Sequence, residues 1–142
     1  EQRAEPGFEE PLYPGARETV ERLADEHWLL GVATGKNRRG LDIVFEHHGL
    51  HRYFQTLQTV DGGPGKPNPR MVLDAMAATG ARAEETVMIG DTSFDMMMAR
   101  AAGAHALGVS WGFHTVDEIE QGGAHSIHHD FDALNGALAR FL

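Results

Sequence analysis

Two aspartates that follow a short apolar run are the residues best suited to chemistry in this chain. In the stretch TVMIGDTSFDMMMARAAG, residues 86–103, Asp91 directly follows a glycine and Asp95 comes four residues later. The run Thr86–Ile89 is apolar and partly β-branched, which predicts a strand buried on both faces of a parallel sheet. If a helix begins near Ser93, both carboxylates lie close to the carboxyl end of that strand. Two like charges at one place need a positive partner.

Two interpretations of this acidic pair follow from its placement. In the first, Asp91 or Thr92 is a helix N-cap and Asp95 lies in the first turn, where the helix dipole favours a negative charge. In the second, the pair binds Mg²⁺, which takes one or two carboxylates and completes its coordination with water and substrate phosphate. The spacing alone does not choose between a cap and a metal site.

The composition of the 142-residue chain argues against several classes of function. A formal net charge of -9 argues against nucleic acid and against an anionic membrane surface as partners, because phosphate groups are held by clustered lysine and arginine. There is no cysteine, no apolar run of membrane-spanning length and no export leader, so we expect a cytoplasmic protein without disulfides. Only two of the twelve basic residues are lysines, Lys36 and Lys66, and each follows a glycine.

Helical and strand patterns alternate along the sequence. Helices are predicted over residues 12–27, 37–49, 70–80, 94–103, 115–123 and 130–142, and strands over 28–35, 54–60, 86–89, 105–112 and, as an edge strand, 125–129. This alternation predicts an α/β fold, a Rossmann-like doubly wound parallel sheet with helices on both faces. The third helix is expected to turn Val72, Leu73 and Met76 inward. Residues 1–10 are polar with one proline and a second follows at Pro11, so they indicate a linker, and 11–142 form one domain.

Polar residues follow four of the predicted strands. Because ligands collect at the carboxyl ends of parallel strands, these residues are candidates for a shared site. Thr34 and Gly35 offer a hydroxyl and an unhindered backbone N–H to a phosphate oxygen, and Lys66 offers a compact positive charge. Asp91 and Asp95 are the acids already described, and Ser110-Trp111-Gly112 ends the fourth strand. Each feature alone is equally well explained by an ordinary strand end or a solvated loop.

Together, and in this order, the segments VATG, GKPNP and GDTSFD resemble the second, third and fourth motifs of haloacid dehalogenase-type hydrolases, most closely the phosphoglycolate phosphatase-like branch. The resemblance extends over nearly all of residues 11–142. It implies a Mg²⁺-dependent hydrolysis of a small phosphate monoester through an aspartyl-phosphate. Thr34, with Gly35, would bind the transferring phosphoryl group, Lys66 would steady that group and the nucleophile, and Asp91 and Asp95 would hold Mg²⁺ directly or through water.

The first motif of that family, an aspartate nucleophile with a second acid followed by Gly-Thr, is absent from this sequence. The only Asp-x-Asp pair, Asp130 and Asp132, lacks the Gly-Thr and is interpreted as an N-cap with a first-turn acid. The helical cap that normally follows the first motif is also missing, and residues 1–10 resemble its trailing edge. We therefore expect the chain alone to be inactive, and we place Phe113 and His114 near the substrate.

Two other classes of protein stay open as alternatives. One is a non-catalytic module of the same fold that binds phosphate or a metal ion. The other is a receiver-type signalling domain, which the order of Lys66 before the acids disfavours. The partner implied by the resemblance is a small phosphorylated metabolite. Without the family's first strand, the apolar edges Leu29 to Ala33 and Thr86 to Ile89 are left unpaired, so we also expect self-association or association with the missing N-terminal segment.

Overall fold

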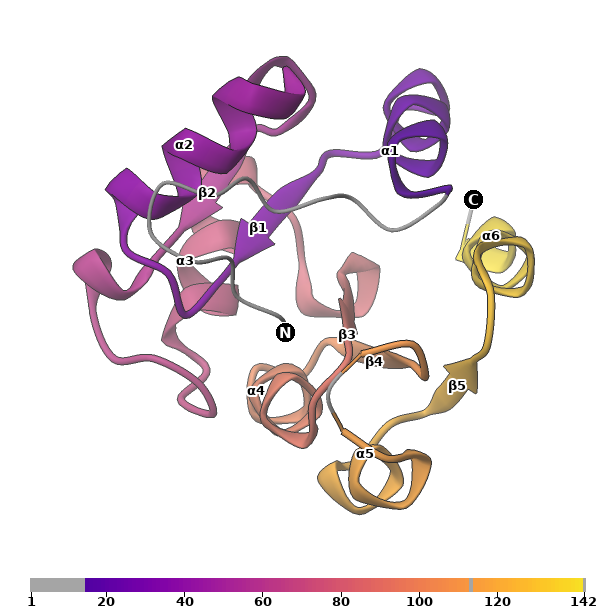
Figure 1. Ribbon diagram of the computed structural model, residues 1–142. Helices are drawn as coiled ribbons and strands as arrows, with labels where there is room; N and C mark the ends of the chain where they lie inside the picture. The colour runs from indigo at the N-terminus through magenta and orange to yellow at the C-terminus, as the bar shows by residue number, and fades with distance from the viewer. Residues whose placement is uncertain (1–14, 113, 142) are drawn as a thin grey trace.

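The computed structural model describes residues 15–112 and 114–141 and shows an α/β fold in the predicted order (Figure 1). The helices are α1 (Ala16–Asp25), α2 (Arg38–His48), α3 (Arg70–Thr79), α4 (Ser93–Ala101), α5 (Val116–Gly122) and α6 (Phe131–Leu138). The strands are β1 (Gly31–Ala33), β2 (Thr56–Gln58), β3 (Val87–Gly90), β4 (His105–Val109) and β5 (Ser126–His128). The predicted linker 1–10 lies outside the described residues.

All strand pairings are parallel, as predicted, but the strands form two sheets instead of one. Strand β1 pairs with β2, and β3, β4 and β5 form a second sheet in that order, with β5 at its edge. Within the described residues, β1 and β3 do not pair with each other. In the described residues, β1 and β3 are therefore both edge strands, each paired on one side only.

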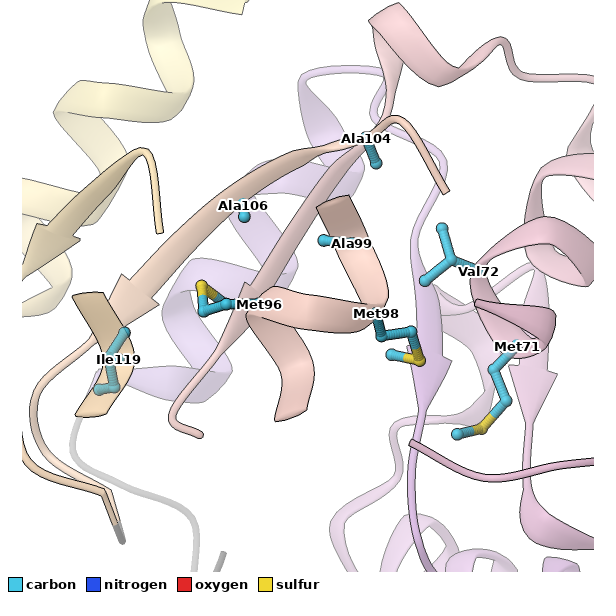
Figure 2. Packing of buried hydrophobic residues seen from close by; sticks show 8 residues of the cluster. All are labelled: Met71, Val72, Met96, Met98, Ala99, Ala104, Ala106 and Ile119. Carbon is cyan, nitrogen blue, oxygen red and sulfur yellow. The ribbon is translucent and has the colours of Figure 1, made fainter. Parts of the chain in front are cut away.

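Helices cover both faces of the three-stranded sheet, as predicted. On one face, Ala106 of β4 belongs to a cluster built from α3, α4 and α5, and Figure 2 shows Met98 of α4 pointing toward α3. On the other face, Leu107 and Val109 of β4 pack against α1 and α6, contacting Leu23 and Leu134 among others. The alternation along β4 thus supplies both faces of the core, as expected for a strand buried on both sides.

Helix ends follow the sequence signals. The Asn37 side chain accepts a hydrogen bond of 2.8 Å from the Gly40 N–H at the start of α2. Gly49 ends the same helix with a φ of 65°, a left-handed conformation that glycine adopts without steric cost. Asp130 caps α6 by accepting from the Ala133 N–H at 2.7 Å, which agrees with the interpretation of Asp130 and Asp132 as a cap and a first-turn acid.

Two predictions about burial are wrong. The third predicted strand is β3 and keeps Val87, Met88 and Ile89 only half-buried, because its edge toward β1 has no neighbour. In α3, Leu73 is 44% exposed, whereas Met71 and Val72 are buried against α4. The helix is rotated so that Met71 takes the inward position that the apolar spacing had assigned to Leu73.

No helix in the described part of the chain combines the length and the apolar character that crossing a membrane requires.

His128 in β5 should make the fold less stable in mild acid. Partial burial, and then the charges of His129 and Arg140, lower the pKa of His128 below its ordinary value. As the pH falls through about 6.5, the unfolded chain therefore takes up this proton first, and the free energy of unfolding decreases until the pKa of the folded state is passed. Urea denaturation at about pH 7.5 and about pH 5.5 should show a smaller loss in His128→Gln than in the unsubstituted chain. An equal loss of unfolding free energy in the two proteins would show that protonation of His128 does not destabilise the fold.

Candidate active site

An ion pair between Lys66 and Asp95 joins the two sheets at their carboxyl ends. Lys66 lies in the loop that leads from β2 to α3, and Asp95 lies in the first turn of α4, which follows β3. The Lys66 ammonium lies 2.5 Å from Asp95 Oδ1, and the side chains are 20% and 3% exposed. Since no hydrogen bond reaches Oδ1 itself, the ammonium is the charge that compensates this buried oxygen. Lys66 is therefore the positive partner of Asp95, one of the two acids for which the sequence predicted such a partner.

Asp95 is also held by the start of its own helix. Thr92 is the N-cap of α4, and its Oγ1 accepts from the Asp95 N–H at 3.1 Å. In return, Asp95 Oδ2 accepts from the Thr92 N–H at 3.2 Å and from the Thr92 hydroxyl at 3.0 Å. This reciprocal capping box confirms Thr92, and not Asp91, as the N-cap of the first interpretation. It also fixes the carboxylate that contacts Lys66.

Two glycines make room for the two acids. A Cβ atom added to Gly90 would overlap the Asp95 side chain, and one added to Gly112 would overlap the Cβ and carboxylate of Asp91. Gly90 ends β3, and Gly112 belongs to the loop after β4. The Asp91 carboxylate therefore lies directly against the backbone of that loop. The contact between Gly112 and Asp91 joins segments about twenty residues apart, so no local signal in the sequence predicts it.

Thr34 and Gly35 lie immediately after β1, at the carboxyl end of the two-stranded sheet. Thr34 is buried, its N–H donates to the Gln58 carbonyl at 3.0 Å, and its Oγ1 accepts from the Lys36 N–H at 3.1 Å. A threonine hydroxyl carries one hydrogen and two lone pairs, so the O–H of Thr34 is left to donate to a ligand. The Gly35 backbone is exposed beside it. This arrangement offers two donors to an anion.

His114 holds the turn between β3 and α4, residues 91–93, in place, and the sequence did not predict this role. The His114 ring Nδ1 accepts from the Ser93 backbone N–H at 3.0 Å, and the His114 backbone N–H donates to the Asp91 carbonyl at 3.3 Å. The ring also packs edge-on against Phe94, with centroids 5.6 Å apart. The neighbouring Phe113, predicted to lie near the substrate, is outside the described residues.

Two residues of the fourth predicted strand end, Ser110 and Trp111, contact other parts of the fold. Ser110 Oγ lies 2.7 Å from His129 Nδ1, and Trp111 packs on Phe131 with ring centroids 4.6 Å apart. The third residue of this strand end, Gly112, lies against the predicted site residue Asp91.

The acids fit Mg²⁺ as a minimal site, not as a complete protein cage. Within residues 15–112 and 114–141, no three acidic or histidine side chains lie close enough to form a metal centre by themselves. Mg²⁺ does not need such a centre, since it keeps several waters and uses one or two carboxylates. Asp91 at the end of β3 suits a direct ligand, and Asp95, already bonded to Lys66 and Thr92, suits a contact through water.

Removing the Lys66 ammonium should destabilise the fold, because Asp95 would remain buried without its counter-charge. We expect Lys66→Met to lower the free energy of unfolding by about 3 kcal/mol in urea denaturation, a typical cost of breaking a buried pair. Arg82 forms only exposed ion pairs, so Arg82→Met should cost less than about 1 kcal/mol.

The double variant Lys66→Met/Asp95→Asn separates this pair from a general effect of each residue. It should lose clearly less stability than the sum of the two single variants, because the second change removes the stranded charge. Additive losses would show that the two side chains do not interact in solution.

Comparison by sequence and comparison by fold relate this chain to the same group of known proteins. The sequence model of the haloacid dehalogenase-like hydrolases matches residues 7–109. A protein of Dickeya dadantii named "Probable phosphatase IndB" is 37% identical over 132 residues, which are 92% of this chain and 57% of that protein. The phosphoglycolate phosphatase of Agrobacterium fabrum is 33% identical over 96% of this chain and 58% of its own length.

Among solved structures, a hydrolase from Pseudomonas syringae superposes with a TM-score of 0.81 at 30% sequence identity, covering 90% of this chain and 60% of the hydrolase. The chain thus spans less than two thirds of the length of these relatives. The family match covers well over half of the chain, and it includes the elements that carry Thr34, Lys66, Asp91 and Asp95. The chain belongs to the haloacid dehalogenase-like hydrolases.

Proposed function

We propose that this chain is the core of a Mg²⁺-dependent phosphatase that hydrolyses a small, phosphoglycolate-like phosphate monoester. The observation that carries the proposal is the Lys66–Asp95 pair, which lies where the carboxyl ends of both sheets meet. A fixed ammonium at that edge can stabilise the negative charge of a phosphoryl group in transfer. Phosphatases among the relatives support this choice of reaction.

Each described residue has a distinct task in this proposal. The Thr34 hydroxyl and the Gly35 N–H donate to phosphate oxygens. The Lys66 ammonium has three hydrogens, so it can donate to Asp95 and still donate to a phosphate oxygen. Asp95 is then a positioning residue for the ammonium, and His114 positions Asp91 through the backbone contacts described above.

Asp91 would hold Mg²⁺ directly, with Asp95 contributing through water. Bound there, the ion would neutralise phosphate charge, which is the usual contribution of a divalent cation to phosphoryl transfer. The covalent step needs an aspartate that attacks phosphorus, expels the alcohol and is later freed from phosphate by water. Asp130 does not supply it, because its carboxylate caps α6. The chain alone should accordingly bind phosphate without turning over an ester.

The same observation about Asp130 supports a second candidate, a phosphate- or metal-binding module that has no nucleophile of its own. The two candidates differ in what a preceding Asp-x-Asp-Gly-Thr strand would do. In the phosphatase it creates turnover, whereas in the binding module it adds no activity.

Mg²⁺ should bind weakly, since Asp91 and Asp95 leave most of the coordination sphere to water. Calorimetric titration of the chain with Mg²⁺ should give a saturable heat that Asp91→Asn abolishes. Asp132→Asn removes the same charge at the exposed start of α6 and is the matched control, with the heat expected to persist. Equal heats in the unsubstituted chain and in Asp91→Asn would exclude Asp91 as a ligand.

Turnover should appear when a strand carrying Asp-x-Asp-Gly-Thr and a cap precede residues 11–142. We expect Mg²⁺-dependent hydrolysis of p-nitrophenyl phosphate by this longer protein. Lys66→Ala should slow it by about 100- to 1,000-fold, because a charge aimed at the phosphoryl group is lost. Arg82→Ala removes an exposed cation that precedes the amino end of β3, away from the carboxyl end that carries Asp91, and should keep the full rate. An unchanged rate in Lys66→Ala would remove Lys66 from the mechanism.

A further inference from the structure

A groove of about 430 Å³ lies between α6 and the strands β4 and β5, which are drawn in orange to yellow in Figure 1. None of the residues that line this groove belongs to the candidate active site. Its ionisable lining residues are three histidines and one arginine, and none of the described lining residues is acidic: they are His105, His125, His128 and Arg140. In a chain with a formal net charge of -9, a groove whose ionisable groups are all basic is suited to an anion.

Backbone contacts hold two of the imidazole rings side by side. His125 Nδ1 accepts from the Ala106 N–H at 2.9 Å, so the neutral ring carries its hydrogen on Nε2, which can donate to a ligand. His105 Nε2 lies 3.1 Å from the Glu84 carbonyl oxygen, and because that oxygen can only accept, the ring nitrogen donates. The centroids of the two rings are 5.9 Å apart. The rings are therefore oriented by the fold and not by each other.

Positive charge gathers at this groove without a compensating acid. Partial burial, and then the charges of Arg100 and His105, lower the pKa of His125 below its ordinary value. Arg140 takes part in none of the ion pairs between described residues. An anion bound here would supply the negative charge that the basic side chains lack.

The groove also has an apolar wall. Leu107 of β4 is buried at its base, and Phe141 is 39% exposed with its ring centroid 4.8 Å from that of His105. Gly136 lines the groove from the interior of α6, and an added Cβ atom there would meet nothing within 4 Å. Glycine is unfavourable inside a helix relative to alanine, and no close packing requires it here. Its effect is to keep the space above the helix open.

We propose that this groove binds a small organic anion that carries a phosphate or carboxylate group on an aromatic body. The Arg140 guanidinium and the imidazole N–H groups bind the charged group. The exposed ring of Phe141 and the side chain of Leu107 contact the aromatic body. The volume of about 430 Å³ lies in the usual range of small-molecule sites. This proposal stands apart from the phosphatase chemistry, because the two sites share no residue.

The test is a titration of the ¹⁵N-labelled chain without Mg²⁺, followed by the backbone amides of Ser126, Gly136 and Phe141. Phenylphosphonate and benzoate should shift these amides to saturation, and the tighter of the two identifies the charged group. Phenylphosphonate should bind at least about tenfold more tightly than inorganic phosphate, because only it reaches the apolar wall. Neutral benzamide should cause no saturable shift. Equal binding of phenylphosphonate and inorganic phosphate, binding of benzamide, or shifts confined to Gly35 and Asp91 would overturn the proposal.

Two pairs of variants test the charge and the space separately. Arg140→Gln should weaken phenylphosphonate binding at least about tenfold, since a charge-assisted contact is lost, whereas Arg52→Gln, at an exposed arginine in another part of the fold, should not. Gly136→Leu should fill the groove and abolish binding, whereas Ala139→Leu, at an exposed position outside the groove, should preserve it. Leucine is a better helix former than glycine, so Gly136→Leu should keep its melting temperature. Full affinity in Arg140→Gln or in Gly136→Leu would contradict the assignment.

Binding should also be coupled to proton uptake. Partial burial, and then the charges of His129 and Arg140, lower the pKa of His128, and the pKa of His125 is lowered as described above. A bound anion favours the protonated rings and raises both pKa values. The affinity for benzoate should therefore increase as the pH falls from about 7.5 to about 5.5, and the increase should be smaller in His125→Gln. An affinity that stays constant over this range would show that the histidines do not hold the anion, and would overturn the proposal.

Discussion

The Lys66–Asp95 ion pair is the interaction on which the architecture of this chain depends. No hydrogen bond between β1 and β3 holds the two sheets together in the described residues, so contacts between the elements around them must do so. On one face this is the packing of Met71 and Val72 on α4, and at the carboxyl edge it is the ion pair. Apolar packing tolerates sliding, whereas a buried charge permits little displacement from its partner.

The same pair links the fold to its chemistry. A buried ion pair adds little net stability compared with an apolar contact of similar size, although breaking it is costly. Its position at a strand edge fits the binding role that we propose better than a purely stabilising one. Asp95 is fixed by Thr92, and Lys66 is fixed by Asp95, so the ammonium is already oriented without a ligand, as the proposed phosphate site requires. Such preorganisation is what lets a charge act on a reacting group without first having to be ordered.

The sequence was a good guide wherever a local signal determined the structure. Alternating patterns predicted the order of helices and strands, the helix predicted over residues 37–49 ends at Gly49, and Asp130 was correctly expected as an N-cap. Thr92 and Asp95 also carry a local signal, a threonine followed three residues later by an acid, which is the pattern of a capping box. Asp95 therefore belongs to the helix cap and is still available to the proposed site, so the two interpretations of the acidic pair are not exclusive.

Contacts between distant segments could not be predicted in this way. The overlap that an added Cβ at Gly112 would make with Asp91, and the bond from Ser93 to His114, depend on how the loop after β4 folds over α4. The half-buried state of β3 and the inward turn of Met71 instead of Leu73 depend on what lies beside each element. Apolar periodicity identifies a buried face in general, but it does not say which neighbour is present.

The central claim is that one phosphate site spans the carboxyl ends of both sheets. The most direct measurement is a titration of the ¹⁵N-labelled chain with inorganic phosphate in the presence of Mg²⁺, followed by the backbone amide resonances. The amides of Gly35 in one half and of Asp91 and Thr92 in the other should shift together and saturate with a single dissociation constant. Shifts confined to one half, or two unrelated dissociation constants, would contradict a shared site.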